Sequence, residues 1–344
     1  MLFSIVVPIY NMEKYLAECL DSIVPQAFAL QEETEILLID DGSSDESGRI
    51  CDFYQKKFPE LIQVFHKKNE GLLITRKFGY ERASGKYLIN CDADDRLSNQ
   101  MLSKIKEVVQ STDCDTVIYN LVRFDEKSEN LFYTNVFTNE KCCQVSLDEV
   151  FREFFLSDFP SVTSMCGKAF KREKLIDAPG YDDCVQINQG EDTLLSGVLY
   201  GNVSRILYLN EPLYYYRGGS GMTAHFSDTY YKDWKKVFEI ILRQKDTVPK
   251  DIFDRFFPVK YLNCVGRTLT VTCNEIGLSF SNRKRYIKQI REDDLYLQYY
   301  QERKRTGTNI KKRYRFLLYL LERKRYFCLH VVLSIQGYWK RLAE

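Results

Sequence analysis

Short apolar runs alternate with amphipathic segments through the first 120 residues, and this rhythm constrains the fold more than any other feature of the chain. Each run is apolar on both faces of a strand, and the segments between the runs have apolar positions at helical spacing. Strands of this kind occur in parallel sheets that helices cover on both sides. The predicted strands are residues 3–9, 35–41, 61–66, 86–92 and 115–121.

Polar side chains gather at one edge of this predicted α/β sheet. In such a sheet the ligand lies beyond the carboxyl ends of the strands. Tyr10 and Asn11 follow the first strand there, and Asp41 ends the second. We also expect Asn11 to cap the helix that begins after it.

The fourth strand ends in the acidic sequence "CDADD", which contains Asp92, Asp94 and Asp95. Carboxylates this close repel one another and raise each other's pKa, so the cluster calls for positive charge nearby. A divalent cation would supply it. A solvated turn is the alternative, because Asp is common where strands end.

The composition is that of a globular protein: 44% of the 344 residues are hydrophobic and 28% are charged. The eleven cysteines show no C-x-x-C spacing, which favours buried thiols in a reducing compartment. No stretch of about 18 apolar residues predicts a membrane span. Charge is uneven along the chain. Residues 281–344 contain 17 Lys and Arg against 6 Asp and Glu, a net +11, which leaves −10 for residues 1–280.

Four ordered blocks take the place of the usual nucleotide-binding loops. The chain has neither G-x-G-x-x-G after its first strand nor a G-x-x-x-x-G-K-[ST] loop. It has instead "VVPIYNMEKYL", "IDDGSSDES", "NEGLLITRKFGYERASGKYL" and the acidic strand end. In this order and spacing the blocks resemble those of the inverting glycosyltransferase family 2. The resemblance is close over residues 3–110 and looser to about residue 225. It implies the A-type glycosyltransferase fold, a Rossmann-like, mostly parallel mixed sheet between helices.

The resemblance assigns the nucleotide to the first three blocks. Asp41 would accept a hydrogen bond from the uracil or a related base, which a carboxylate recognises well. Pro8 and Tyr10 would form the wall against which the base packs, and Arg76 would supply positive charge to the nucleotide. The structural alternatives are that Asp41 caps the helix starting near Ser43 and that Arg76 lies on a solvated helix face.

The acidic strand end matches the D-x-D motif of the family. Mn²⁺ or Mg²⁺ is the hard cation that carboxylate and diphosphate oxygens prefer. We expect Asp94 and Asp95 to lie nearest the metal, and Asp92 to contribute to the metal site or face the ribose. The metal would neutralise the nucleoside diphosphate as it leaves.

A base for the acceptor hydroxyl is expected in "NQGEDTLLSGVLY", residues 188–200. The resemblance assigns Asp192 as this base, with Glu191 orienting the acceptor. The alternative is that both are acids favoured by the dipole at the start of a helix. A glycosidase also uses two carboxylates, but it needs neither a metal cluster nor a base-recognising Asp41.

Two further segments complete the expected site. In "YYYRGGSGMTAHFS", residues 214–227, Arg217 would clamp a diphosphate oxygen and Gly218, Gly219 and Gly221 would give mobility. His225 would approach the metal in a closed state or be a polar loop residue. In "CGKAFKREKL", Lys168 and Lys171 would face a phosphate on the acceptor side or lie on the solvated surface.

We predict two regions, a nucleotide-sugar-binding catalytic domain at 1–227 and a mostly helical, basic region at 228–344. Basic and aromatic residues interleaved in the second region favour peripheral contact with an anionic membrane, and packing or a homodimer interface is the alternative. No motif supports binding to nucleic acid.

The resemblance implies a bacterial enzyme at the cytoplasmic face of the cell membrane. It would transfer a sugar, with inversion, from a nucleotide-diphosphate sugar, most simply a UDP-sugar, to a hydroxyl of a lipid-linked glycan or cell-surface polysaccharide intermediate. Two alternatives stay open: a transferase that extends a glycan on a protein, and a non-catalytic, transferase-like partner subunit.

Overall fold

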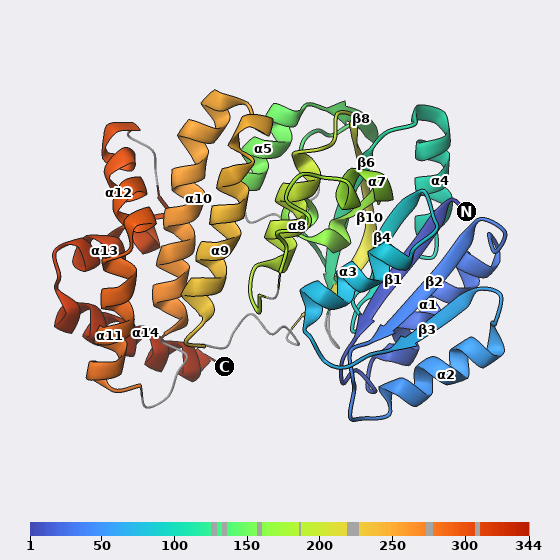
Figure 1. The fold of residues 1–344 in the computed structure, drawn as a ribbon, viewed down its shortest axis with the longest axis horizontal. Helices are drawn as coiled ribbons and strands as arrows, with labels where there is room; N and C mark the ends of the chain where they lie inside the picture. Colours follow the sequence, from blue (N-terminus) through green and yellow to red (C-terminus); the bar gives the residue numbers. More distant parts are fainter. Residues whose placement is uncertain are drawn as a thin grey trace. The chain divides into compact units, whose positions relative to one another are not determined.

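The structure is a computed structural model that describes residues 1–124, 129–132, 136–156, 160–185, 187–218, 227–272, 278–306 and 310–343. The chain divides into two compact units (Figure 1). The first comprises Met1–Ser220 and Ile240–Val248, and the second comprises Gly221–Glu239 and Pro249–Glu344.

The first unit is built on one mixed sheet. Its described strands are β1 Phe3–Ile9, β2 Thr34–Asp40, β3 Ile62–His66, β4 Tyr87–Asn90, β5 Arg96–Leu97, β6 Thr116–Phe124, β7 Glu129–Phe132, β8 Cys142–Val145, β9 Lys168–Lys171 and β10 Ile206–Arg217. The main order is β3-β2-β1-β4-β9-β6-β10-β5, with β7 paired to β6 and β8 paired to β10. Strands β3, β2, β1 and β4 are parallel, as are β6 and β10, whereas β9 is antiparallel to both of its neighbours.

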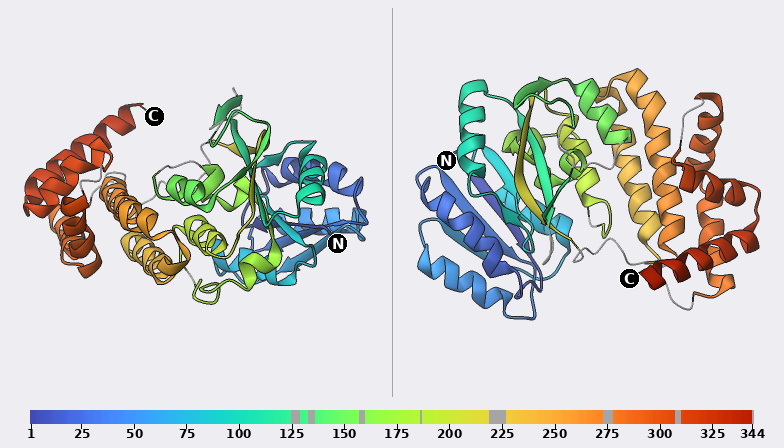
Figure 2. Two further views of the ribbon diagram at one scale, coloured as in Figure 1. Left: turned by 90° about the horizontal axis from the view of Figure 1, so that it is seen from above. Right: turned by 180° about the vertical axis from the view of Figure 1, so that it is seen from behind.

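Helices cover both faces of this sheet, as the two views in Figure 2 show. They are α1 Leu16–Phe28, α2 Ser47–Lys57, α3 Leu72–Arg82, α4 Met101–Thr112, α5 Leu147–Leu156, α6 Pro160–Thr163, α7 Arg172–Ile176 and α8 Glu191–Tyr200, with a short 3-10 turn η1 at Met165–Gly167. Alternate side chains of β1, such as Ile5 and Val7, join α1 and α4 in the main core. Val6, which points to the other face, lies against Gly79 of α3. The predicted α/β class is therefore confirmed.

The second unit is helical. The helices that follow residue 227 are α9 Tyr230–Arg243, α10 Lys250–Val271, α11 Phe280–Arg291, α12 Asp294–Thr306, α13 Lys312–Glu322 and α14 Tyr326–Ala343. Aromatic rings fill much of its core: Phe257 of α10 packs against Phe238 and Tyr299, with ring centroids 5.6 and 5.0 Å apart. This unit thus has apolar packing of its own.

The structure corrects the expected role of Asn11. Helix α1 begins at Leu16 after Tyr15, and Asn11 lies four residues earlier with a left-handed backbone, φ 54°. Its side chain instead accepts hydrogen bonds from the backbone N–H and hydroxyl of Ser44, in the loop after β2. An Asn tolerates this left-handed conformation better than most residues do, because its side chain can bond to nearby backbone.

Candidate active site

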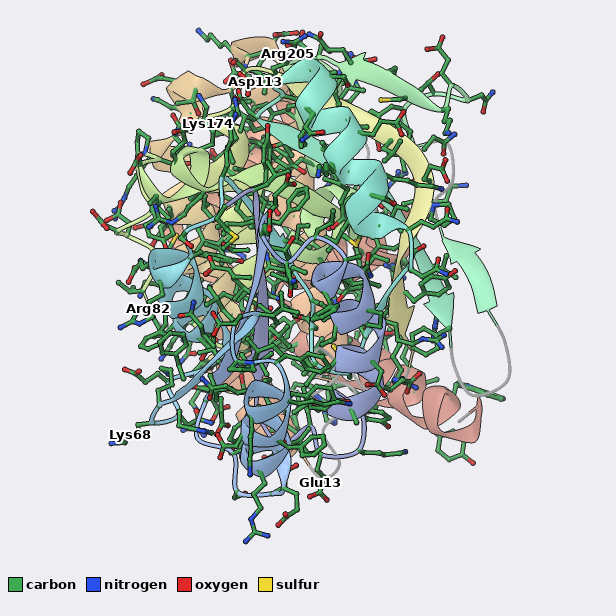
Figure 3. All side chains as sticks on the ribbon, turned by 90° about the vertical axis from the view of Figure 1, so that its right-hand side faces the viewer. Glu13, Lys68, Arg82, Asp113, Lys174 and Arg205 are labelled. Atoms are coloured by element: carbon green, nitrogen blue, oxygen red, sulfur yellow. The ribbon has the colours of Figure 1, made fainter. Side chains whose placement is uncertain are left out.

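The polar residues predicted to form the site follow β1, β2 and β4 at their carboxyl ends. Two residues labelled in Figure 3 mark this end of the sheet. They are Glu13, which follows β1, and Lys68, which follows β3. Asp113 and Arg205, which precede β6 and β10, lie at the opposite end. The acidic strand end after β4 therefore shares an edge with Tyr10 and Asp41.

The loops after β1 and β2 are fastened to each other by reciprocal hydrogen bonds. The backbone N–H of Glu13 donates to the carboxylate of Asp45 at 3.0 Å, and the backbone N–H of Glu46 donates to the carboxylate of Glu13 at 3.0 Å. Pro8 lies buried within β1, whereas Tyr10, just beyond it, is 46% exposed. An exposed ring on a fixed loop is suited to stacking against a flat ligand.

Asp41 is buried, and both oxygens of its carboxylate are engaged. Oδ1 accepts from Lys67 Nζ at 2.5 Å and from the backbone N–H of Glu70 at 3.0 Å, and Oδ2 accepts from the N–H of Gly71 at 2.9 Å. Gly71 precedes α3, so Asp41 holds the start of α3. The alternative of a cap on a helix starting near Ser43 is wrong, because α2 begins at Ser47; the Ser43 N–H in the loop before α2 donates to Asp40 at 2.9 Å.

The three carboxylates after β4 have different surroundings. Asp95 is 1% exposed, and its two oxygens accept from Tyr214 Oη at 2.6 Å and from the backbone N–H of Arg217 at 2.7 Å. Burial, reinforced by the charges of Asp94 and Asp92, raises the pKa of the Asp95 carboxyl well above its ordinary value. Asp92 and Asp94 are half-buried. Asp95 thus joins the acidic turn to β10, and Asp92 and Asp94 are the more accessible carboxylates of the turn.

Arg217 ends β10 and lies against the acidic turn. Its Nε donates to the backbone carbonyl of Asp94 at 2.7 Å, and another guanidinium nitrogen pairs with Glu18 of α1 at 2.5 Å. The guanidinium also lies 4.6 Å from the ring centroid of Tyr15 and 4.5 Å from that of Phe124. Its predicted contact with a diphosphate stays a prediction.

Arg76 of α3 joins the acidic turn to the start of α8. Its guanidinium is fully buried and donates to Asp92 Oδ1 at 2.8 Å and to Asp192 Oδ1 at 2.7 Å, with Glu191 Oε1 4.0 Å away. Burial alone would lower the pKa of Arg76, but the carboxylates of Asp192 and Asp92 outweigh it and raise the pKa above its ordinary value. The alternative of a solvated helix face is therefore wrong.

The first turn of α8 holds the two candidate catalytic carboxylates. Gly190 precedes the helix with φ 86°, a left-handed conformation that favours glycine. Asp192 Oδ1 also accepts from the backbone N–H of Met165 at 3.1 Å, whereas its Oδ2 has no hydrogen bond from any described residue. Burial, followed by the charge of Asp192, raises the pKa of Glu191 to about 7. One oxygen of Asp192 is thus fixed, and the other is available to a substrate.

Lys168 and Lys171 of β9 are both buried, so neither lies on a solvated surface. Lys168 Nζ donates to the carbonyl of Ser164 and to Ser196 Oγ, and burial lowers the pKa of Lys168 to about 7. Lys171 Nζ pairs with Asp113 and Asp115 at 3.2 and 3.3 Å, at the end of the sheet opposite to the acidic turn.

The acidic turn has the oxygen ligands that suit a divalent cation, but it offers only a few of them. Within the described ranges, no three His, Cys, Asp or Glu side chains are placed to hold a metal together. Mg²⁺, however, is commonly held by one or two carboxylates with the remaining ligands from substrate phosphates and water. The half-buried Asp92 and Asp94 offer such carboxylates, whereas Asp95 is almost fully buried and both of its oxygens accept hydrogen bonds from β10. Gly219, Gly221 and His225 lie outside the described residues.

The model of the protein family named "Glycosyl transferase family 2" matches residues 4–176, half of the chain. The chain belongs to glycosyltransferase family 2. Among its curated relatives, the glycosyltransferase GlyG of Streptococcus pneumoniae is 31% identical over 249 residues, which are 69% of this chain and 78% of GlyG. GlyA of the same organism is 32% identical over 222 residues, which are 62% of this chain but 30% of GlyA.

Solved structures show the fold of this family 2 glycosyltransferase. Residues 1–349 of Staphylococcus aureus TarS, in complex with UDP-GlcNAc, superpose with a TM-score of 0.72. The match covers 99% of this chain and 92% of that structure at 19% identity. The expected A-type fold with a helical C-terminal extension is confirmed.

The sequence did not indicate several residues that shape the site of this transferase. Tyr214 was part of a segment expected to be mobile, yet its hydroxyl holds Asp95 and also accepts from the backbone N–H of Asp92 at 3.1 Å. Lys67 pairs with Asp41, and Glu18 pairs with Arg217. Each acts through a contact between elements distant in the chain, which local patterns do not reveal.

Proposed function

We propose that this family 2 glycosyltransferase moves a sugar from a UDP-sugar to a hydroxyl of a lipid-linked glycan or cell-surface polysaccharide intermediate, with inversion. The carrying observation is that the buried guanidinium of Arg76 brings Asp92 of the acidic turn and Asp192 of α8 together at the carboxyl ends of the strands. The edge proposed to bind the nucleotide and the carboxylate proposed as general base are thus joined in one site.

The activities named for relatives support this class of donor and acceptor. TarS is described as a poly(ribitol-phosphate) beta-N-acetylglucosaminyltransferase, and one of its structures contains UDP-GlcNAc. GgaB of Bacillus subtilis, 24% identical over 262 residues, is described as a minor teichoic acid biosynthesis protein. We extend the class, a nucleotide sugar and a surface-polymer acceptor, to this chain.

In the proposed mechanism Asp192 removes the proton from the acceptor hydroxyl. Arg76 and the N–H of Met165 hold Oδ1, which leaves Oδ2 to accept the proton as the hydroxyl oxygen attacks the anomeric carbon. Glu191, one residue before the base, orients the acceptor. Tyr10 packs against the nucleotide base, the buried Pro8 and Asp41 hold the surrounding loops in place, and Arg217 approaches the diphosphate.

We further propose that the reaction depends on Mn²⁺ or Mg²⁺, held by Asp92 and Asp94, with Asp95 supporting the turn. When bound there, such a cation would supply positive charge to the departing diphosphate. For location, we propose the cytoplasmic face of the membrane with peripheral contact. None of the helices in the described ranges combines the length and apolarity that crossing a bilayer requires.

The test is turnover of Asp192→Asn with a panel of UDP-sugars, measured as released UDP in the presence of Mn²⁺ and of acceptor fractions. Loss of a general base lowers rates by about 10²- to 10⁴-fold, and we expect a loss in this range with UDP binding retained. Asp182→Asn, a change at an exposed acid, is the matched control and should turn over as the wild type does. Equal turnover of Asp192→Asn and wild type would reject the role of Asp192. A wild type that binds no UDP would favour the non-catalytic alternative.

A further inference from the structure

Helix α14 is apolar on both of its faces. Leu329 and Leu333 are fully buried on the inner face. On the outer face an exposed stripe repeats at intervals of about one helical turn, which we call the α14 stripe. Its members and their exposed fractions are Phe327 67%, Val331 38%, Ile335 51%, Tyr338 57% and Trp339 65%. A helix that is apolar all round is normally covered on every side.

Contacts on the inner face hold α14 in this orientation. The buried Arg283 of α11 donates to Ser334 Oγ at 2.8 Å and lies 2.9 Å from His330 Nδ1. Together with Leu329 and Leu333, these contacts fix one side of the helix on the second unit. The α14 stripe therefore cannot turn toward the core of the second unit without breaking them, and an exposed apolar surface of this kind marks a site of interaction.

Basic residues flank the α14 stripe in the sequence. Residues 311–344 contain nine Lys and Arg against two Asp and Glu. Arg323, Lys324 and Arg325 come directly before the helix and are exposed. Lys340 and Arg341 follow Trp339 in the sequence, and α14 itself contains no acidic residue.

The positive charge distinguishes between two partners that could cover the α14 stripe, a second copy of the chain and a membrane. In a symmetric dimer the same patch meets itself, so the basic residues of both copies would be brought together and would repel. An anionic bilayer surface offers apolar acyl chains below negatively charged headgroups, and so it complements the stripe and its charges together. At 1.5 Å per residue, the 18 residues of α14 extend about 27 Å, and they lie in the second unit with charges at both ends.

We propose that the α14 stripe docks on an anionic phospholipid surface, with the helix axis in the plane of the membrane and Tyr338 and Trp339 at the headgroup level. This inference deepens the proposed function, because it assigns the membrane contact to particular side chains, and it rests on that function for its biological purpose. Binding to a bilayer itself requires neither donor nor acceptor.

The test uses the full chain and vesicles of phosphatidylcholine with or without phosphatidylglycerol. We expect co-sedimentation with the mixed vesicles, weaker binding at high salt, and little binding to pure phosphatidylcholine. The chain has two tryptophans, so Trp234→Phe leaves Trp339 as the sole reporter. Its fluorescence should shift to shorter wavelength on addition of the mixed vesicles.

The variant Phe327→Ser/Ile335→Ser/Trp339→Ser removes the stripe at exposed positions, and its vesicle affinity should fall about tenfold or more. Phe53→Ser, at a 60% exposed position of α2, is the matched control and should bind as the wild type does. Unaltered binding by the triple variant would overturn the proposal. So would a wild-type dimer that the triple variant dissociates while neither protein binds vesicles. UDP release in vesicle-free solution, measured on the same preparations, tests the proposed function separately.

Discussion

At the scale of single residues, Arg76 is the group on which the site depends most. Two carboxylates from different elements, Asp92 and Asp192, share its buried guanidinium. The guanidinium offsets the repulsion between the two carboxylates, which is stronger in partly buried surroundings than in water. Arginine suits the position better than lysine, since its planar fork donates to two acceptors at once.

Arg76→Met should lower the free energy of unfolding by about 3–5 kcal/mol, because it leaves two partly buried carboxylates without their cation. Urea unfolding at neutral pH measures this loss. The triple variant Arg76→Met/Asp92→Asn/Asp192→Asn should recover part of it, since no uncompensated charge remains. A cost below about 1 kcal/mol for Arg76→Met, or no recovery in the triple variant, would contradict this account.

Lys168 gives the stability a predicted dependence on pH. Burial lowers the pKa of Lys168 from 10.5 to about 7 in the folded protein. Between these values the unfolded chain holds a proton that the folded chain has released, so stability rises with pH across this window. Below about pH 7 the cost of the buried charge is complete, and above the ordinary lysine pKa it is absent.

The difference in unfolding free energy between wild type and Lys168→Met should therefore increase from pH 7 to 10 by up to about 1.4 kcal/mol per pH unit. Lys171→Met is the matched control on the same strand. The pKa of Lys171 is raised, with burial opposing and the bonds to Asp113 and Asp115 prevailing, so its contribution should stay constant over this range. A wild-type-minus-Lys168→Met difference that does not change with pH would refute the prediction.

At the scale of elements, Gly79 fixes how closely α3 approaches the sheet. A Cβ atom at this position would lie 2.5 Å from Val6 Cγ1 of β1. In a helix interior an alanine is favoured over glycine by about 1 kcal/mol, but overpacking a core costs about 1–3 kcal/mol. We expect the overpacking against β1 to outweigh the gain in helix propensity, so that the substitution lowers the stability.

Gly79→Ala should thus destabilise the protein by about 1–2 kcal/mol and reduce turnover, because Arg76 lies one turn earlier on the same helix. Thermal unfolding and UDP release measure the two effects. Gly197→Ala in α8 is the control, since its Cβ would lie 3.2 Å from the nearest atom, Ile241 Cγ1, and a small adjustment relieves that contact. A more stable Gly79→Ala variant would show that α3 can move away from β1 at little cost.

Elements apolar on both faces could be predicted from the sequence, and elements placed by distant partners could not. β1 was predicted at its observed bounds, and β2 within one residue at each end, because buried parallel strands have a strong apolar signal. β9 was missed because lysines flank its short apolar centre. Lys168 and Lys171 are buried through contacts with Ser164, Ser196 and Asp113, which come from other segments.

The candidate site shows the same limit. The acidic strand end and the Glu191–Asp192 pair could be located from motif and spacing, but the link between them through Arg76 could not, because 116 residues separate Arg76 from Asp192. Asp95 illustrates why: its neighbours in sequence suggest a metal ligand, whereas Tyr214 and the backbone of Arg217 already occupy its oxygens. Such assignments depend on side-chain partners that only the folded chain brings together.

At the scale of the whole molecule, the chain consists of two compact units with separate apolar packing. The residues proposed to bind donor and metal lie in the first unit, and the α14 stripe lies in the second. A ligand stabilises the part of a protein that binds it, by RT ln(1 + [L]/Kd), or about 2.7 kcal/mol at one hundred times Kd.

Calorimetry should therefore resolve two transitions, of which UDP with Mn²⁺ raises one by about 5–10 °C and leaves the other unchanged. EDTA should abolish the shift, because the proposed cation would supply the positive charge that lets a diphosphate lie beside the carboxylates. Asp94→Asn should reduce the shift by removing a proposed ligand, whereas Asp182→Asn, at an exposed acid away from the strand end, should preserve it. If UDP shifted the transition equally with EDTA present, the nucleotide would bind without a metal, and Asp94 would need another role. If both transitions moved together, the two units would unfold as one.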